Sequence, residues 1–324
     1  MLKEYYGVEK ILYVIIAVIG VPVNLVAIFI LSQGKCGLSK CTTRDLVAMA
    51  AADLLLITTE VIFRKINDHY FPMCFLDITI VCRTNLALTY IAVDCSVWFT
   101  VTFTFDRYVA ICCQKLRTKY CTEKTAATVL ATTGILFCLK NVPFYFSRES
   151  REIIDNVPWF CVTKSSYYTE LGWVGFDWLD ACLNPLLPFA VILPLNALTV
   201  RYVLVASRVR KCLKVRSKGG NLIDPEMQNR RKSVVLLFTI SGSFIFLWLT
   251  FVVEFVYYQI TGTGGEWNDP ELVFHEAGFF LTNISCCTNT FIYTATQTKF
   301  REQLKKAVKY LVGSVRRNIN RVTT

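Results

Sequence analysis

The stretch SVWFTVTFTFDRYVAICC, residues 96–113, decides the fold of this chain, because a helix-length apolar run closes on two adjacent charges and then turns apolar again. The two charges are Asp106 and Arg107. A buried ion pair rarely stabilises a helix by itself, since the cost of desolvation tends to cancel the attraction. The pair therefore requires an explanation other than stability.

Apolar runs like this one recur along the chain. Of its 324 residues 54% are hydrophobic and 18% are charged, and the mean hydropathy is +0.43, whereas soluble domains carry about 25% charged residues. Segments of ~20 apolar residues cross a hydrocarbon core of ~30 Å as helices. Seven such segments lie near 10–32, 44–63, 78–112, 125–146, 173–206, 231–259 and 272–296. The sequence predicts an all-α membrane protein, a bundle of seven transmembrane helices.

Basic residues predict the orientation of this bundle. The segments 35–44, 115–124, 208–232 and 299–321 hold 24 of the 35 Lys and Arg residues. Because basic loops stay on the cytoplasmic side, we expect an extracellular N-terminus and a cytoplasmic C-terminus. The net charge of +11 then belongs to a face that meets anionic membrane lipids, and nucleic-acid binding is not expected.

Polar side chains at membrane depth are costly and mark function or helix contacts. Asp53 lies in the second span, Ser96 in the third, and Ser285 and Asn289 in the seventh. Several oxygen-bearing side chains at a shared depth predict a polar cluster that holds water or a sodium ion. We expect no other cofactor.

The 14 cysteines show no metal-ligand spacing, and most are interpreted as small apolar fillers. Cys82 and Cys161 both fall on the predicted outer side, where a disulfide persists. Cys74 lies on the same side and is an alternative partner.

The charged pair now has an interpretation. Asp106-Arg107-Tyr108 resembles the Asp/Glu-Arg-Tyr motif that ends the third helix of the rhodopsin-like (class A) G-protein-coupled receptors. Cys82 lies 25 residues before Arg107, where that family has its disulfide cysteine. The resemblance implies that Asp106 holds Arg107 at rest and releases it towards a G protein on activation, as a bistable element.

Further motifs of the family lie at matching positions in later spans. Trp248 resembles the sixth-helix switch Trp, with Phe244 one turn below, and NTFIY, from Asn289 to Tyr293, resembles Asn-Pro-x-x-Tyr. Two prolines of the family pattern are absent, because Thr250 and Thr290 occupy their positions. Helices without these prolines are straighter, which puts the usual switching amplitude in doubt.

Within the family, ILSQ, AAADLL and SVWFTVTFTFDRY are most similar to orphan receptors that respond to aromatic amino acids and small peptides. An opsin is excluded, because Asn283 occupies the position where a retinal-binding Lys is needed.

The outer half of the predicted bundle carries many charges. Either these residues pair with each other, as Asp94 with Lys140, or some remain open for a zwitterionic ligand, with Arg64 or Arg83 receiving a carboxylate. Glu60 lies four residues before Arg64, and Asp177, Asp180 and Asn184 share one face of the fifth helix. The candidate ligand-binding residues are Arg64, Thr89, Tyr90, Asp180, Trp248, Phe251, Phe255 and Phe279.

The receptor domain is expected to cover residues 1–312, and residues 313–324 to form a short cytoplasmic tail. An eighth helix at 298–312 has one apolar face and one basic face, which is typical of a helix lying at the membrane surface. Its apolar face consists of Phe300, Leu304, Val308 and Leu311.

The leading functional hypothesis is a plasma-membrane receptor for an amino-acid-like or short-peptide ligand, coupled to a heterotrimeric G protein of the Gq/11 or Gi/o class by resemblance. The alternatives are an atypical or decoy receptor without G-protein signalling and, less favoured, a transporter, which would show internal repeats or broken helix pairs. The chain is not expected to be an enzyme, because His69 and His275 are its only histidines and no hydrolytic constellation is visible.

Overall fold

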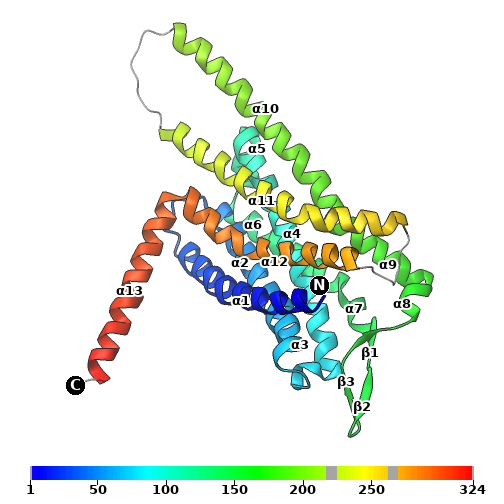
Figure 1. Cartoon of the computed structure of the whole chain (residues 1–324). Coiled ribbons are helices and arrows are strands. Elements are labelled where there is room, and N and C mark those ends of the chain that lie inside the picture. Colours follow the sequence, from blue (N-terminus) through cyan, green and yellow to red (C-terminus); the bar gives the residue numbers. More distant parts are fainter. Residues whose placement is uncertain (1, 217–224, 262–268, 323–324) are drawn as a thin grey trace.

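The computed structural model describes residues 2–216, 225–261 and 269–322, and these form a helical bundle (Figure 1). The α-helices are α1 Leu2–Ser32, α2 Lys40–Leu56, α3 Asn67–Tyr70, α4 Thr79–Cys112, α5 Gln114–Tyr120, α6 Glu123–Lys140, α7 Val142–Phe146, α8 Ser166–Thr169, α9 Leu171–Ala181, α10 Leu187–Arg216, α11 Pro225–Thr261, α12 Asp269–Thr296 and α13 Thr298–Val322. Two π-helical segments, Ile57–Ile66 and Cys182–Leu186, join α2 to α3 and α9 to α10, and a 3-10 turn covers Phe75–Asp77.

In the described part of the chain, six helical rods are long and apolar enough to cross a membrane. They are Gly7–Ser32, Lys40–Tyr70, Thr79–Cys112, Glu123–Phe146, Leu171–Arg208 and Arg231–Tyr257. The 28-residue helix α12 packs against α11 and α1 as the seventh rod. Its hydropathy is lower because its second half carries Thr, Asn and Ser residues. The predicted seven-helix bundle is therefore the observed fold.

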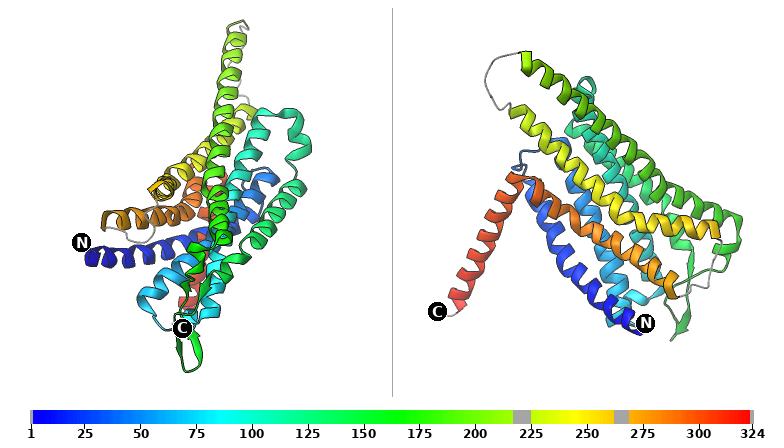
Figure 2. Two further views of the ribbon diagram at one scale, coloured as in Figure 1. Left: turned by 90° about the vertical axis from the view of Figure 1, so that its right-hand side faces the viewer. Right: turned by 45° about the horizontal axis from the view of Figure 1, so that its top comes forward.

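Most rods extend beyond their predicted bounds. The second covers Lys40–Tyr70, where 44–63 was expected. Helix α13 reaches Val322, so the helix expected to end at 312 continues through most of the predicted tail 313–324. A hydropathy pattern marks only the apolar part of a helix, and Arg, Lys and Glu favour helix continuation as strongly as Leu does. In Figure 1 and in the right-hand view of Figure 2, α13 points away from the bundle.

The fifth rod is interrupted by Cys182–Leu186. Asn184 there has φ −153° and ψ 102°, far from helical values, and Pro185 follows it. Proline has no N–H to donate and its ring disfavours a helical conformation in the preceding residue. The break turns Asn184 towards the interior, and single-turn π segments of this kind frequently occur at functional sites.

Four short strands follow α7, a feature that the sequence pattern did not reveal. β1 (Arg148–Glu149) pairs antiparallel with β4 (Val162–Thr163), and β2 (Glu152–Ile154) pairs with β3 (Val157–Trp159). The inner hairpin turns at Asp155 and Asn156, with φ of 51° and 61°. Positive φ at both turn residues matches a two-residue hairpin turn, and Asp and Asn tolerate this conformation.

The predicted disulfide between Cys82 and Cys161 is present, with a Cα–Cα distance of 6.1 Å. It ties the strands to the start of α4. Beside it, the hydroxyl of Thr79 donates to the carbonyl of Phe160 at 2.7 Å. We call this end of the bundle the hairpin end. The start of α1 lies there too, since Glu9 accepts a hydrogen bond from Lys65 near the end of the second rod.

Close packing of α1 against α12 sets the frame of the bundle. Asn24 is fully buried, and its amide donates to the carbonyls of Gly20 at 3.0 Å and Cys286 at 2.9 Å. A Cβ on Gly20 would lie 2.5 Å from Cδ1 of Ile57 and 2.8 Å from Sγ of Cys287. A larger residue at this position would force the side chains of Ile57 and Cys287 to move, so glycine allows the close approach of the three rods.

Candidate functional site

A cavity of about 450 Å³ lies in the hairpin-end half of the bundle. All eight candidate ligand-binding residues line it, although they come from five different rods. These are Arg64, Thr89, Tyr90, Asp180, Trp248, Phe251, Phe255 and Phe279. The bundle thus brings together residues that are more than 200 positions apart in the chain.

Aromatic rings connect the cavity with the bundle interior. Phe279 on α12 lies edge-on to Phe251 on α11, with ring centroids 5.3 Å apart. Phe251 contacts Trp248 at 5.9 Å, and Trp248 contacts Phe244 at 5.4 Å. Trp248 and Phe244 are buried in a cluster with Val97 and Val101 of α4. A ligand touching Phe251 is therefore linked by direct contacts to residues one to two turns deeper.

Tyr90 forms another wall. Its ring stacks on Phe144 of α7 with centroids 3.7 Å apart and an interplanar angle of 6°. Phe144 is itself packed against Phe176 of α9 at 5.0 Å. The short helix α7 therefore anchors the cavity wall, because it places Phe144 between the third and fifth rods.

The first charged group of the cavity is an internal ion pair. The guanidinium of Arg64 donates through Nε and Nη2 to the two carboxylate oxygens of Glu60, with Nε to Oε2 at 2.6 Å. This bidentate pairing gives both the Nε and the Nη2 of Arg64 a hydrogen-bond acceptor. Arg83, the other cation considered for a ligand carboxylate, is not among the residues that line the cavity. Of the two cations considered, Arg64 is the one that lines the cavity.

The second charged group is a buried network around Lys140. Its ammonium donates to Asp94 at 2.9 Å, which confirms the expected pair, and it also binds Asp180. Asn141 donates to Oδ2 of Asp94 at 2.7 Å, and Asn184 donates to Oδ1 at 2.9 Å. The broken fifth rod supplies both Asp180 and Asn184. One ammonium thus serves two carboxylates, which leaves the group with a negative charge.

Asp177, one turn from Asp180 on the same face, accepts a hydrogen bond from the Tyr167 hydroxyl at 2.8 Å. Burial and this acceptor raise the pKa of Tyr167 above its usual value. The phenol therefore stays neutral and donates, and Tyr167 does not neutralise the carboxylate.

Three charged or titratable lining residues were not assigned to the cavity from the sequence: Arg148, Glu254 and His275. Arg148 follows α7, and its Nε is buried without a hydrogen-bond partner in the described part of the chain. Glu254 lies on α11, and its Oε1 is 3.0 Å from Nδ1 of His275. A single acid inside the apolar run FVVEFVYY was a usable signal for Glu254, since intramembrane ionisable residues mark function.

The polar cluster at mid-depth is partly assembled as expected. Ser96 donates to Oδ1 of Asp53 at 2.5 Å, and the amide of Asn289 donates to Oδ2 at 2.8 Å. Asp53 is buried. Ser285 makes no hydrogen bond to Asp53 in the described structure, because it lies on the same face of α12 as Asn289 but one helical turn away.

The charged pair that decided the fold behaves differently from the expectation. Asp106 accepts a hydrogen bond from Sγ of Cys41 at 2.6 Å, and no ion pair joins it to Arg107 among the described residues. Nε and Nη2 of Arg107 are buried without hydrogen-bond partners. The expected direct restraint of Arg107 by Asp106 is therefore wrong for this arrangement. Adjacent residues on a helix point about 100° apart, which turns the carboxylate towards α2.

A second cavity of about 380 Å³ lies at the end opposite the hairpins. Arg107 lines it, together with three further cations and no acid. The cations are Arg117, Lys232 and Lys299. Tyr293 is buried close by, with its ring 5.8 Å from that of Phe300 at the start of α13. Tyr108 is only half-buried.

Comparisons with known proteins agree with this architecture. A sequence profile described as "7 transmembrane receptor (rhodopsin family)" matches residues 23–293. The chain is 26% identical over 311 residues to C-C chemokine receptor type 1 of Macaca fascicularis, covering 91% of this chain and 78% of the relative. It is 24% identical over 329 residues to apelin receptor A of Danio rerio, covering 94% and 84%. The chain is thus a receptor rather than an enzyme, a multi-pass protein of the plasma membrane that belongs to the rhodopsin family of seven-transmembrane receptors.

Proposed function

We propose that the chain binds an extracellular amino-acid-like or short-peptide ligand in the hairpin-end cavity and activates a heterotrimeric G protein through Arg107. The main support for this proposal is that eight residues selected from the sequence line one cavity. The basic loops at the opposite end support an orientation in which the hairpin end lies outside the cell. The relatives are named as receptors for a C-C chemokine and for apelin, which supports a secreted signal as the class of ligand.

The charges favour a ligand with net positive charge. Glu60, Asp94, Asp177, Asp180 and Glu254 line the cavity. Their cationic counterparts are Arg64, Arg148 and Lys140, so the acids exceed the cations by two when His275 is neutral. Buried carboxylates of this kind are natural partners for ammonium groups. We propose that Asp177 and Asp180 receive an ammonium, that Arg148 receives a carboxylate, and that Phe251 and Phe279 hold an aromatic group.

The proposed output runs from the cavity to the opposite end. Trp248 links the cavity wall to Phe244 by ring contacts. At the far end, Arg107 lines the cavity of about 380 Å³, and its Nε and Nη2, which have no hydrogen-bond partner in the described structure, are available to a partner carbonyl or carboxylate. The G protein, of the Gq/11 or Gi/o class by resemblance, is the proposed partner.

The decisive experiment measures nucleotide exchange by a panel of purified G proteins. Wild-type receptor is reconstituted with each G protein, with aromatic amino acids or short basic peptides as ligands. Arg107→Ala should abolish ligand-driven exchange while ligand binding is retained. The matched control is Arg44→Ala, because Arg44 lies at the same end and pairs with Glu123 on the surface. It should signal like wild type.

Two variants test the cavity itself. Asp177→Asn and Arg148→Gln should each lower ligand potency by about tenfold or more, with surface expression unchanged, because a lost charge-assisted hydrogen bond is worth ~1.5–3 kcal/mol.

If Arg107→Ala signals like wild type, the atypical or decoy receptor replaces this proposal. Helices α11 and α12, which run unbroken through Thr250 and Thr290, are the observation that favours that second function.

A further inference from the structure

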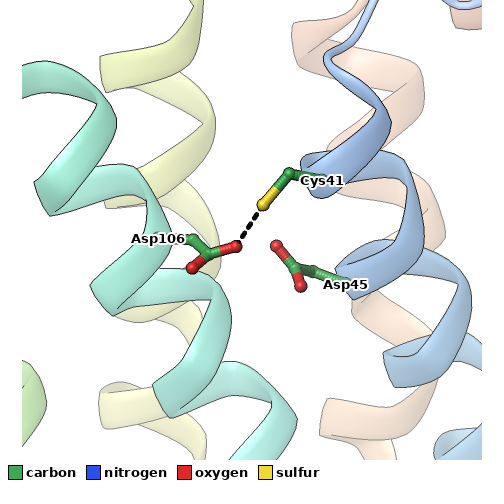
Figure 3. Close-up of side chains that lie close together, drawn as sticks. All are labelled: Cys41, Asp45 and Asp106. Carbon is green, nitrogen blue, oxygen red and sulfur yellow. Dashed lines mark hydrogen bonds between the residues drawn. The ribbon is translucent and has the colours of Figure 1, made fainter. Parts of the chain in front are cut away.

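Three side chains gather at the end opposite the hairpins, between α2 and α4. Cys41 and Asp45 lie one turn apart on α2, and Asp106 faces them from α4 (Figure 3). The thiol sulfur and one carboxylate oxygen of each acid all lie within 4.8 Å of one another. No spacing in the sequence revealed this group, because one of its members comes from a rod 60 residues further along the chain.

The group is deeply buried. The exposed fractions are 1% for Cys41, 0% for Asp45 and 2% for Asp106. Sγ of Cys41 donates to Oδ2 of Asp106 at 2.6 Å, whereas neither carboxylate oxygen of Asp45 has a hydrogen-bond partner in the described structure. Figure 3 shows the Asp45 carboxylate turned into the space between Cys41 and Asp106.

An unpartnered buried carboxylate is expensive. Leaving such a group without a donor costs more than a lost neutral hydrogen bond, and a second carboxylate beside it adds repulsion. Buried charges are normally paired or coordinate metals. Serine, threonine or lysine could have satisfied Asp45, but the side chain that meets it is a thiol already donating to Asp106.

One thiolate and two carboxylates form a ligand set that suits Zn²⁺. Zinc in proteins takes sulfur at ~2.3 Å and carboxylate oxygen at ~2.0–2.2 Å, usually with four ligands. Carboxylates alone would select Mg²⁺ or Ca²⁺, whereas the thiolate selects a softer ion. The carboxylate of Asp106 must give way slightly, because the metal takes the place of the proton between it and the sulfur.

The charges also balance around such an ion. A deprotonated Cys41 with two ionised carboxylates carries three negative charges. The positive charge of Arg107 acts on both Cys41 and Asp45. Arg107 with a divalent cation supplies three positive charges, so the site would be neutral, which a buried site requires. Thr42 and Arg107, the chain neighbours of Cys41 and Asp106, line the cavity of about 380 Å³ and provide a route from solvent.

We propose that Cys41, Asp45 and Asp106 form a Zn²⁺ site that clamps α2 to α4 beside Arg107, with water as the fourth ligand. On binding, the sulfur forms a bond to zinc and its proton leaves to solvent, so no redox change is involved. The metal holds Asp106 on the α2 side and away from Arg107. Zinc is therefore a regulator of the switch region, independent of which ligand or G protein the receptor uses.

The test uses the full-length receptor, purified in detergent and stripped of metal with a chelator. Zn²⁺ binding is measured by competition with a chromogenic chelator, and thiolate ligation is followed by the ultraviolet absorption of Cd²⁺–sulfur bonds. Wild type should bind one more equivalent than Cys41→Ser and Asp45→Asn, and Cys41→Ser should lack the Cd²⁺–sulfur band that wild type shows.

The matched control is Cys36→Ser. Cys36 is a buried thiol lining the same cavity, and its sulfur donates to the carbonyl of Ile30. Cys36 is not one of the three side chains that gather at the proposed site, so this variant should bind as wild type does. Equal stoichiometry in all four proteins would overturn the proposal.

A measurement on the unmodified chain covers the case in which a variant fails to fold. The rates at which Cys41 and Cys36 are alkylated are mapped by mass spectrometry with and without Zn²⁺. Zinc should slow alkylation of Cys41 at least tenfold and leave Cys36 unchanged. An unchanged rate at Cys41 would overturn the site, whatever the variants do.

Discussion

The thiol of Cys41 on α2 donates a hydrogen bond to the carboxylate of Asp106 on α4 at 2.6 Å, and this contact occupies the acid that the sequence motif pairs with Arg107. Arg107 in turn keeps two buried N–H groups without partners in the described structure. The switch motif is thus divided between two surfaces. Asp106 takes part in a contact between α2 and α4, and Arg107 lines a cavity.

This division predicts the pattern of energetic coupling. In metal-free receptor, a double-mutant cycle of Cys41→Ala with Asp106→Asn should give a coupling energy of about 0.5–3 kcal/mol, as residues in direct contact do. The cycle of Cys36→Ala with Asp106→Asn should add within ~0.5 kcal/mol, since no contact joins that pair. Free energies of unfolding from chemical denaturation provide the measurement. Equal coupling in the two cycles would contradict the contact.

The disulfide predicts a large loss of stability at the hairpin end. Replacing Cys82 and Cys161 together by Ser should lower the free energy of unfolding by about 2–5 kcal/mol. The disulfide closes a loop of 79 residues, so its loss gives the unfolded chain more conformational entropy and releases the strands from α4. Cys74→Ser is the control and should cost much less. Non-reducing peptide mapping separates the alternatives, and a peptide joining Cys74 to Cys161 would refute the pairing.

Local sequence patterns predicted the rods well, because a run of ~20 apolar residues has few other uses. They predicted the disulfide and the Asp94–Lys140 pair through shared depth and side. They missed the hairpins, since strands of two or three residues leave no periodicity to detect. They also missed the Cys41, Asp45 and Asp106 group, because a contact between α2 and α4 depends on the rotation of each helix about its axis.

Differences of one or two helical turns in depth explain the misassignments of Ser285 and Arg83. Ser285 and Asn289 are one helical turn apart, and approximate depth alone could not show that Asn289 reaches Asp53 and Ser285 does not. Arg83 shares a face of α4 with Tyr90 but lies two turns nearer the hairpin end, outside the residues that line the cavity. Arg148 was missed because it follows a span and is brought over the cavity by the first pair of strands.

The Lys140 network predicts a strong dependence on its one cation. Lys140→Met should destabilise the receptor by about 3–5 kcal/mol, because Asp94 and Asp180 would remain buried without a counter-charge. Adding Asp94→Asn to this variant should restore part of the loss. Glu123→Gln, which breaks an exposed pair with Arg44, is the control and should leave the unfolding midpoint unchanged. A similar small effect of Lys140→Met would mean that the network is solvated.

The Asp53 cluster predicts a specific response to sodium. Both carboxylate oxygens already accept hydrogen bonds, from Ser96 at 2.5 Å and Asn289 at 2.8 Å, so three rods converge on one negative charge at mid-depth. A monovalent cation there would offset the buried charge and favour this arrangement over any in which α12 moves away.

Sodium at ten times its dissociation constant should add about 1.4 kcal/mol of stability. Thermal unfolding in sodium against potassium, with chelator present to remove divalent ions, measures the effect. Asp53→Asn should abolish the difference, whereas Asp45→Asn, which removes another buried acid two turns away on the same helix, should retain it. A sodium shift that survives Asp53→Asn would show that the ion acts elsewhere and that the cluster is only a contact between helices.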